Sequence, residues 1–165
     1  MKLAILLGAV TIGLFFIISG VADEYGTQVG QRFLERDTDY TAYALKNWVT
    51  SNKTDAHHYA IPVLFPLDLL FLLALSGFLL FGSVRCAQSI APLKSWAWLF
   101  AILPAVYALA DLLEDGLLAR LLLAPDKITE GAVAFAKTVT AVKIKTAGVS
   151  IVQTVLIAAA SLVAK

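Results

Sequence analysis

The stretch that decides the fold is WAWLFAILPAVYALADLLEDGLLARLLL, residues 96–123. It is longer than the roughly 20 apolar residues that a membrane-spanning helix needs. Its middle nevertheless carries three carboxylates, at Asp111, Glu114 and Asp115. An ionised group at membrane depth costs at least about 2.5 kcal/mol even on the mildest insertion scale, so something must compensate it. The stretch therefore predicts a transmembrane helix with a polar site inside it.

Long apolar runs also occupy residues 3–22, 61–84 and 133–164, the second of which is interrupted by Asp68. Of the 165 residues, 59% are hydrophobic and 15% are charged, and the mean hydropathy of +0.81 is well above that of soluble domains. Within lipid, only helices satisfy their backbone hydrogen bonds when the connections are this short. The sequence predicts an all-α integral membrane bundle of four transmembrane helices, which form one transmembrane domain over residues 1–165.

The first apolar run has two interpretations. Lys2 precedes it and the small residues Gly20 and Ala22 end it, a pattern that also occurs in cleaved signal peptides. The run is long for the apolar core of a signal peptide, which favours a retained transmembrane helix. Apolar residues continue at helical spacing from Val21 to Phe33, so we expect this helix to extend beyond the bilayer.

Residues 23–59 form a connection that is too long for a plain turn. Leu45 and Trp48 recur at helical spacing, so this extramembrane connection is predicted to be partly helical. Its aromatic residues Tyr40, Tyr43 and Trp48 are predicted to be interfacial, because Tyr and Trp rings favour the headgroup level. A short helix over the mouth of the bundle and an ordered linker with aromatic anchors both fit this pattern.

Basic residues near the helix ends predict the orientation. One side of the bundle carries Lys2, Arg85, Lys94 and Lys165. The other side carries more basic residues, but acidic residues are interleaved with them and several lie far from a helix end. We therefore expect both termini on the cytoplasmic side and the long first connection on the extracytoplasmic side.

The third and fourth helices are expected to run antiparallel, because only a short connection joins them. Pairing residues at equal distances from that connection places Asp111 level with Lys143. The same pairing places Glu114 level with Thr140. The sequence thus predicts that a lysine of the fourth helix compensates the carboxylates of the third.

Asp115 has no basic residue at its own level. Its nearest basic neighbour is Lys137, which is about 3 Å nearer the connection by helical rise. Lys145 lies about 200° around the helix from Lys143 and is expected to reach the headgroups. Small and hydroxyl residues, which transmembrane interfaces favour, line the face that Lys143 shares. That face consists of Lys143, Ala147, Ser150, Thr154, Ala158 and Ser161.

Two more charged residues fall in the same half of the bilayer. Asp68 lies near the start of the second helix and Arg120 near the end of the third. Asp68 also has a simpler interpretation, since it follows Pro66 and Asp is a favoured helix cap. The predicted ion-pair or binding cluster consists of Asp68, Asp111, Glu114, Asp115, Arg120, Lys137 and Lys143. A purely structural network that fixes helix register is the alternative.

The remaining motifs are weak. His57 and His58 lack a third ligand at metal-site spacing, so no metal site is predicted. Cys86, the only cysteine, lies beside Arg85 at a helix end, which favours an incidental thiol over a nucleophile. Standard catalytic signatures, such as a glycine-rich phosphate loop or an HExxH helix, are absent from the sequence. Pro104 is expected either to kink the third helix or to be tolerated there.

These observations favour a non-catalytic integral membrane protein, either an accessory subunit or a binding module, with a buried charged cluster between its third and fourth helices. The first alternative is a small transporter or channel component that handles protons, ions or an amphiphilic ligand. The second is a lipid-acting membrane enzyme in which one carboxylate is the base. The expected partners are membrane lipid and either a membrane protein or a second copy of the chain. A net charge of +1 without a basic stripe argues against nucleic acid, and the sequence specifies no cofactor.

Overall fold

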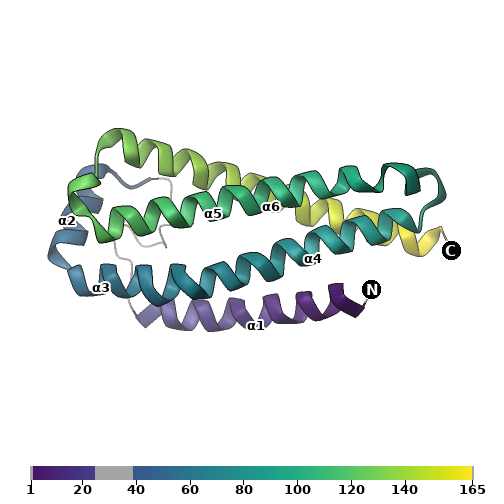
Figure 1. Ribbon diagram of the computed structural model, residues 1–165, viewed down its shortest axis with the longest axis horizontal. Helices are drawn as coiled ribbons and strands as arrows, with labels where there is room; N and C mark the ends of the chain where they lie inside the picture. The colour runs from purple at the N-terminus through teal and green to yellow at the C-terminus, as the bar shows by residue number, and fades with distance from the viewer. Residues whose placement is uncertain (1, 25–38, 165) are drawn as a thin grey trace.

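The computed structural model of the chain describes residues 2–24 and 39–164 (Figure 1). Four helical stretches in this part of the chain are long and apolar enough to cross a membrane. They are Lys2–Val21, Lys53–Gln88, Ala91–Leu123 and Glu130–Val163. The predicted fold class, an all-α bundle with four membrane-spanning helices, is confirmed.

Short connections join most of the helices, and several helices continue directly into the next. In chain order the elements are α1 (Lys2–Glu24), α2 (Ala42–Ser51), α3 (Lys53–His58), η2 (Tyr59–Asp68), α4 (Leu69–Gln88), η3 (Ala91–Ala101), α5 (Ile102–Leu123), η4 (Pro125–Lys127) and α6 (Glu130–Val163). The second predicted span, residues 61–84, therefore lies within one continuous series of helices, α3–η2–α4. The third is likewise extended at its start by η3.

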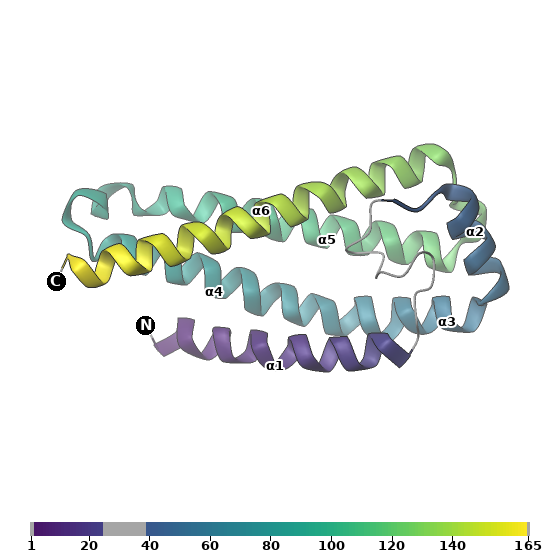
Figure 2. The same ribbon diagram turned by 180° about the vertical axis from the view of Figure 1, so that it is seen from behind.

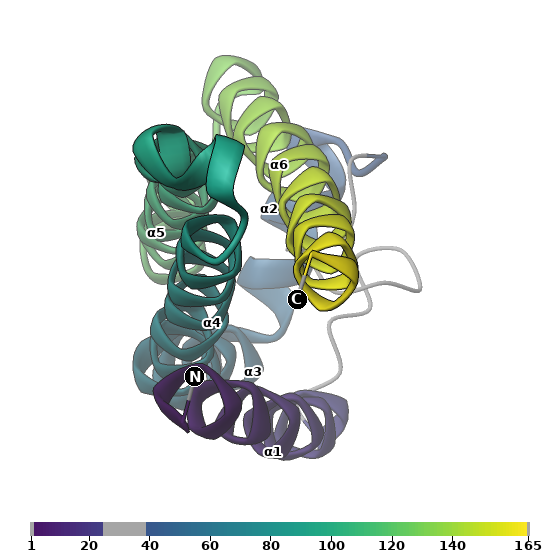
Figure 3. The same cartoon turned by 90° about the vertical axis from the view of Figure 1, so that its right-hand side faces the viewer.

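The bundle is built around α4, α5 and α6, and α1 packs on its outside against α4 (Figures 1 and 2). The helices α5 and α6 run antiparallel, and both contact α4. The end-on view in Figure 3 shows α4 between α1 and α5. Both ends of the chain lie where α4 meets η3, whereas α2 and α3 lie at the opposite end of the bundle (Figure 1).

Local sequence signals account for where the helices begin and bend. Thr129 caps α6, because its Oγ1 accepts a hydrogen bond from the backbone N–H of Ala132 at 3.2 Å. As a result α6 starts at Glu130, earlier than predicted. Within η2, Ile61 and Phe65 have extended backbone angles. Each of them precedes a proline, and the residue before proline is disfavoured in the helical region.

The described part of the first connection is helical, as predicted. The helix α2 follows Thr41, whose Oγ1 accepts a hydrogen bond from the N–H of Ala44 at 3.1 Å. Leu45 and Val49 on α2 are fully buried in an apolar cluster with residues of α5 and α6. Of the two arrangements compatible with the sequence, the structure therefore has a helix that covers one end of the bundle (Figure 2).

The three aromatic residues predicted to be interfacial differ in exposure. Tyr43 is exposed and Trp48 is half-buried, whereas Tyr40 is buried in the apolar cluster that α2 forms with the bundle. The Tyr40 ring thus packs the connection onto the bundle. The predicted extension of the first helix to Phe33 falls mostly outside the described residues, and α1 is described as far as Glu24.

Two glycines bring α1 close to α4. A Cβ atom at Gly77 of α4 would lie 3.1 Å from Leu7 Cδ1, and one at Gly8 of α1 would lie 3.3 Å from the ring of Phe78. Small residues at such contacts let transmembrane helices approach closely. In this structure α1 is therefore a packed helix of the bundle, as a retained transmembrane helix would be.

Pro104 stands in the first turn of α5, directly after the tighter helical segment η3. Proline has no N–H, so the carbonyl of Phe100, which residue 104 would contact in a regular α-helix, lacks that donor. The side-chain amide of Gln153 on α6 donates a hydrogen bond to this carbonyl at 2.8 Å. The proline is tolerated because a neighbouring helix supplies the missing donor.

This arrangement predicts that the effect of replacing Gln153 depends on Pro104. We expect Gln153→Leu to lower the free energy of unfolding by on the order of 1 kcal/mol, because it removes the donor to the Phe100 carbonyl. In a Pro104→Ala background the restored backbone N–H should make the same change nearly neutral. A double-mutant cycle of unfolding in lipid nanodiscs measures this coupling. Equal losses in the two backgrounds would show that Gln153 does not substitute for the missing N–H.

Candidate functional site

The candidate site lies where α4, α5 and α6 meet, inside the apolar spans. The helix α5 contributes Asp111, Glu114 and Asp115, whose spacing of three and four residues places them on one helix face. Their exposed fractions are only 2%, 0% and 0%. Three carboxylates therefore point into the bundle and are shielded from the surroundings by protein.

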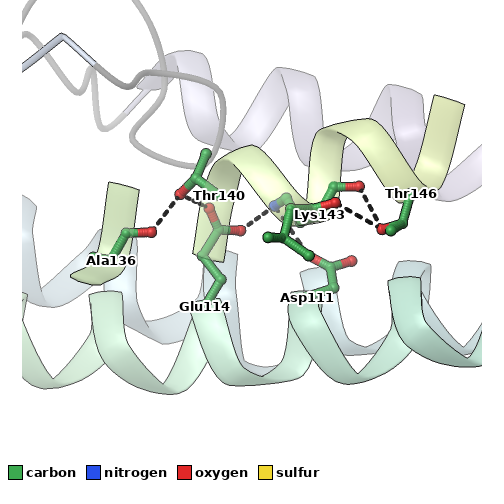
Figure 4. A network of polar contacts seen from close by, with 7 residues as sticks. Asp111, Glu114, Ala136, Thr140, Lys143 and Thr146 are labelled. Atoms are coloured by element: carbon green, nitrogen blue, oxygen red, sulfur yellow. Dashed lines mark hydrogen bonds and ion pairs between the residues drawn. The ribbon is translucent and has the colours of Figure 1, made fainter. Parts of the chain in front are cut away.

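Lys143 of α6 is the cation at the centre of this face. Its Nζ lies 3.0 Å from Asp111 Oδ1, and it also forms an ion pair with Glu114 Oε2 (Figure 4). The Lys143 side chain is itself largely buried. The predicted pairing of Asp111 with Lys143 is confirmed, and the structure adds Glu114 as a second carboxylate of the same lysine.

Thr140 completes the polar contacts of Glu114. Its Oγ1 donates a hydrogen bond to Glu114 Oε1 and also lies 3.1 Å from the carbonyl oxygen of Ala136, so the two acceptors share one hydroxyl proton (Figure 4). Thr140 is fully buried. The sequence predicted that Glu114 and Thr140 lie at the same depth, and the structure shows them in contact. The Thr140 hydroxyl orients one Glu114 oxygen, and Lys143 contacts the other.

Lys137 does not compensate Asp115, so that prediction is wrong. Its Nζ instead donates a hydrogen bond to the backbone carbonyl of Tyr40 at 3.1 Å and lies 5.8 Å from the centroid of the Tyr40 ring. The physical reason is direction, because Lys137 lies about 120° around α6 from Lys143. Its long side chain therefore reaches the first connection and helps to hold Tyr40 against the bundle.

Arg120 also lies away from the cluster. It is about 140° around α5 from Asp115, it is exposed, and with Lys127 it lines a surface cavity of about 260 Å³ beside the α5–α6 connection. In that connection Lys127 Nζ lies 3.1 Å from Asp126 Oδ2 and lowers the pKa of the exposed carboxyl by hydrogen bonding. Lys145 is exposed.

Asp68 belongs to the cluster. One carboxylate oxygen from each of Asp68, Asp111 and Asp115 lies within 4.8 Å of the others. Asp68 occupies the cap position of α4, but its side chain makes no capping hydrogen bond. The structure therefore favours the cluster over the simpler interpretation of Asp68 as a helix cap.

Asp115 is the least compensated member of the group. It is fully buried, and within the described residues neither of its carboxylate oxygens has a hydrogen-bond partner. Among the described residues, the α5 carboxylates Asp111, Glu114 and Asp115 lie near one ammonium, that of Lys143, which contacts Asp111 and Glu114. If all three are ionised, this α5 group carries two more negative charges than the one ammonium offsets. Such an excess in a dry interior is unfavourable unless a positive species joins the carboxylates.

The polar face of α6 continues away from the site as a packing surface. Ser150, Thr154 and Ser161 are buried, and the hydroxyl oxygens of Thr154 and Ser83 of α4 lie 2.7 Å apart. A Cβ atom at Gly82 would lie 3.4 Å from the Thr154 methyl group. The predicted face of small and hydroxyl residues thus fixes α6 against α4 and supports the orientation of Lys143.

Sequence reasoning missed Tyr107. This tyrosine is buried on α5 one turn before Asp111, on the same helix face as Asp111 and Asp115. The spacing of four residues was a signal for its position. The two histidines lie elsewhere: His57 and His58 are exposed on α3, with their ring centroids 6.2 Å apart.

Comparison with known proteins does not help to interpret this site. No family model, curated protein or solved structure matches this chain. Inferences about function therefore rest on the charged residues, their burial and their contacts.

We predict that Lys143 is needed for the stability of the bundle. Lys143→Met leaves the buried Asp111 and Glu114 carboxylates without their cation, and breaking such a pair typically costs about 3–5 kcal/mol. Lys145→Met is the matched control, since Lys145 is exposed on the same helix, and we expect its effect to stay within about 0.5 kcal/mol. Unfolding of both variants in nanodiscs measures the difference. Equal stability of the two variants would contradict the buried ion pair.

Proposed function

We propose that this chain is a non-catalytic integral membrane protein that acts as a binding module, and that its charged cluster is the ligand-binding element. The observation that carries this proposal is the group of three buried α5 carboxylates near one ammonium, with Asp68 beside them, at the meeting of α4, α5 and α6. Membrane interiors tolerate such groups where they pair with each other or serve a function. A positively charged ligand, or a positively charged part of one, is the species that this cluster would favour.

The cluster has two parts with different roles in this proposal. Lys143 with Asp111 and Glu114 links α5 to α6 and sets their register. Asp115 and Asp68 extend the negative charge towards α4. The buried Asp115 carboxylate takes no part in these ion pairs, so its presence supports binding over a purely structural network.

An enzymatic role receives less support. The one thiol, Cys86, lies near the far end of α4, about 27 Å from Asp68 by helical rise. It is therefore out of reach of the carboxylates as a nucleophile. Asp111 and Glu114 are both in contact with Lys143, which occupies carboxylate oxygens that a catalytic base would need for its substrate.

A small transporter or channel component is the second candidate, and one observation favours it. The helix that leads to Asp68 is interrupted at Ile61 and Phe65, where the backbone is extended. Transporter sites are commonly formed at interrupted helices near the middle of the membrane. In this version the cluster would release its ligand to one or both sides of the membrane.

The proposal includes an orientation and a class of partner. Charge near the helix ends favours both termini on the cytoplasmic side, with α2 and α3 on the extracytoplasmic side. The outer face of α1 exposes large apolar residues such as Ile5, Ile12 and Phe16. Membrane lipid covers such a face in a monomer, and another membrane protein would cover it if the chain is an accessory subunit.

The proposal predicts a ligand that depends on the cluster. Native mass spectrometry of the full chain, extracted gently with its own lipids, should show an added mass of defined value. Asp115→Asn should remove most of that adduct because it withdraws an uncompensated charge from the site. Asp126→Asn is the control, since Asp126 is an exposed aspartate outside the spans. An adduct of equal abundance in both variants would place the ligand elsewhere, and its absence from the parent would contradict a binding module.

The transporter candidate predicts flux through the same residues. In vesicles that contain the purified chain, cation or proton uptake should fall to near the level of empty vesicles for Asp111→Asn, because this residue joins the lysine to the carboxylate group. Asp126→Asn should retain the uptake of the parent. Uptake that is unchanged by Asp111→Asn would count against transport and leave the binding module.

A further inference from the structure

The side chains of Asp68, Asp111 and Asp115 have the geometry of a set of metal ligands. Each offers one carboxylate oxygen, and the three oxygens lie within 4.8 Å of one another. Oxygens on opposite sides of a bound Ca²⁺ are separated by about twice the metal–oxygen distance of 2.3–2.6 Å. The observed spacing therefore lets one ion contact all three aspartates after small movements of their side chains.

The second observation is the buried, unpartnered carboxylate of Asp115. This side chain is fully buried, its oxygens have no hydrogen-bond partner among the described residues, and one of them is directed at the other two aspartates. A buried ionised group without partners costs several kcal/mol. The packing of the bundle nonetheless keeps this carboxylate in place, which points to a positive species beside it.

Lys143 does not serve as that species. Its ammonium is engaged with Asp111 Oδ1 and Glu114 Oε2 on α5, and Asp115 forms no ion pair with it within 4.0 Å in the described structure. The other basic residues of the predicted cluster, Lys137 and Arg120, face the first connection and the surface cavity. Within the described residues no basic side chain contacts Asp115, so a positive charge beside it would come from elsewhere.

The groups around the aspartates select the class of ion. Among the described residues, the ionisable groups that face the aspartates are Asp68 at the end of η2, Tyr107, Asp111, Glu114 and Asp115 on α5, and Lys143 on α6. Carboxylate oxygens are hard ligands that suit Mg²⁺ and Ca²⁺ rather than metals that prefer imidazole or thiolate. A divalent ion also offsets more of the excess negative charge than a monovalent ion does.

We propose that Asp68, Asp111 and Asp115 together bind one hard divalent cation, Mg²⁺ or Ca²⁺, inside the bundle. This inference rests on the proposed binding module and names the chemical class of its ligand. The ion would join α4 to α5, as Lys143 joins α5 to α6. The cluster would then tie all three central helices together at one depth.

The test uses the full chain in lipid nanodiscs, first treated with a chelator and then titrated with Mg²⁺ or Ca²⁺. We expect the Tm of the parent to rise and saturate with at least one of the two ions, since a ligand that binds the folded state stabilises it. Asp115→Asn and Asp68→Asn should weaken the apparent affinity by about tenfold or more. The Tm of Asp126→Asn should rise with ion concentration as the Tm of the parent does.

The two aspartate variants keep the test informative if one of them folds poorly, because Asp68 is only half-buried. A parent Tm that neither ion raises would overturn the metal site, as would equal titrations of the parent and both variants. Native mass spectrometry separates this failure from failure of the proposed function. A larger adduct that depends on Asp115, without any metal adduct, would overturn the metal and keep the binding module. Absence of every such adduct would overturn both.

Discussion

The structure depends on one interaction, the contact of the Lys143 ammonium with the carboxylates of Asp111 and Glu114 inside the apolar spans. An uncompensated charge at that depth is so unfavourable that the two helices carrying these residues must face each other at one register. The antiparallel packing of α5 on α6 satisfies this requirement. Thr140, one turn from Lys143 on the same helix, strengthens the register because its hydroxyl contacts the same glutamate.

The rest of the bundle supports that contact from both sides along α6. Towards one end, hydroxyl and small residues hold α6 against α4 through the contact of Thr154 with Ser83. Towards the other end, Lys137 holds Tyr40, and α2 seals the bundle with Leu45 and Val49. Apolar side chains face outwards along the spans. A polar interior inside an apolar exterior makes electrostatic contacts strong, and it makes the carboxylates near Asp115 unfavourable as bare ions.

The sequence predicted what depends on distance along a helix, and it predicted direction around α6 for Lys143 but not for Lys137. Apolar runs located the four spans, and equal distances from a short connection paired Asp111 with Lys143. The same comparison of depths placed Lys137 nearest to Asp115. Its side chain instead points to another face of α6 and contacts Tyr40. The approach of Asp68 to the α5 aspartates depends on the lateral packing of α4 on α5, which no periodicity in a single helix encodes. The burial of Tyr40 is likewise a tertiary effect, because an interfacial pattern does not reveal that α2 folds onto the bundle.

The most direct test of this account is a solid-state NMR distance measurement in lipid bilayers between Lys143 Nζ and the carboxyl carbons of Asp111 and Glu114. The account predicts nitrogen-to-carbon transfer to both carboxyl carbons, at distances of about 4 Å or less, as direct ion pairs require. Lys145 Nζ should show no transfer to any aspartate or glutamate carboxyl of α5. Absence of transfer from Lys143 to both carboxylates in a folded bilayer sample would contradict the account, because the charges that organise the bundle would then be compensated in some other way.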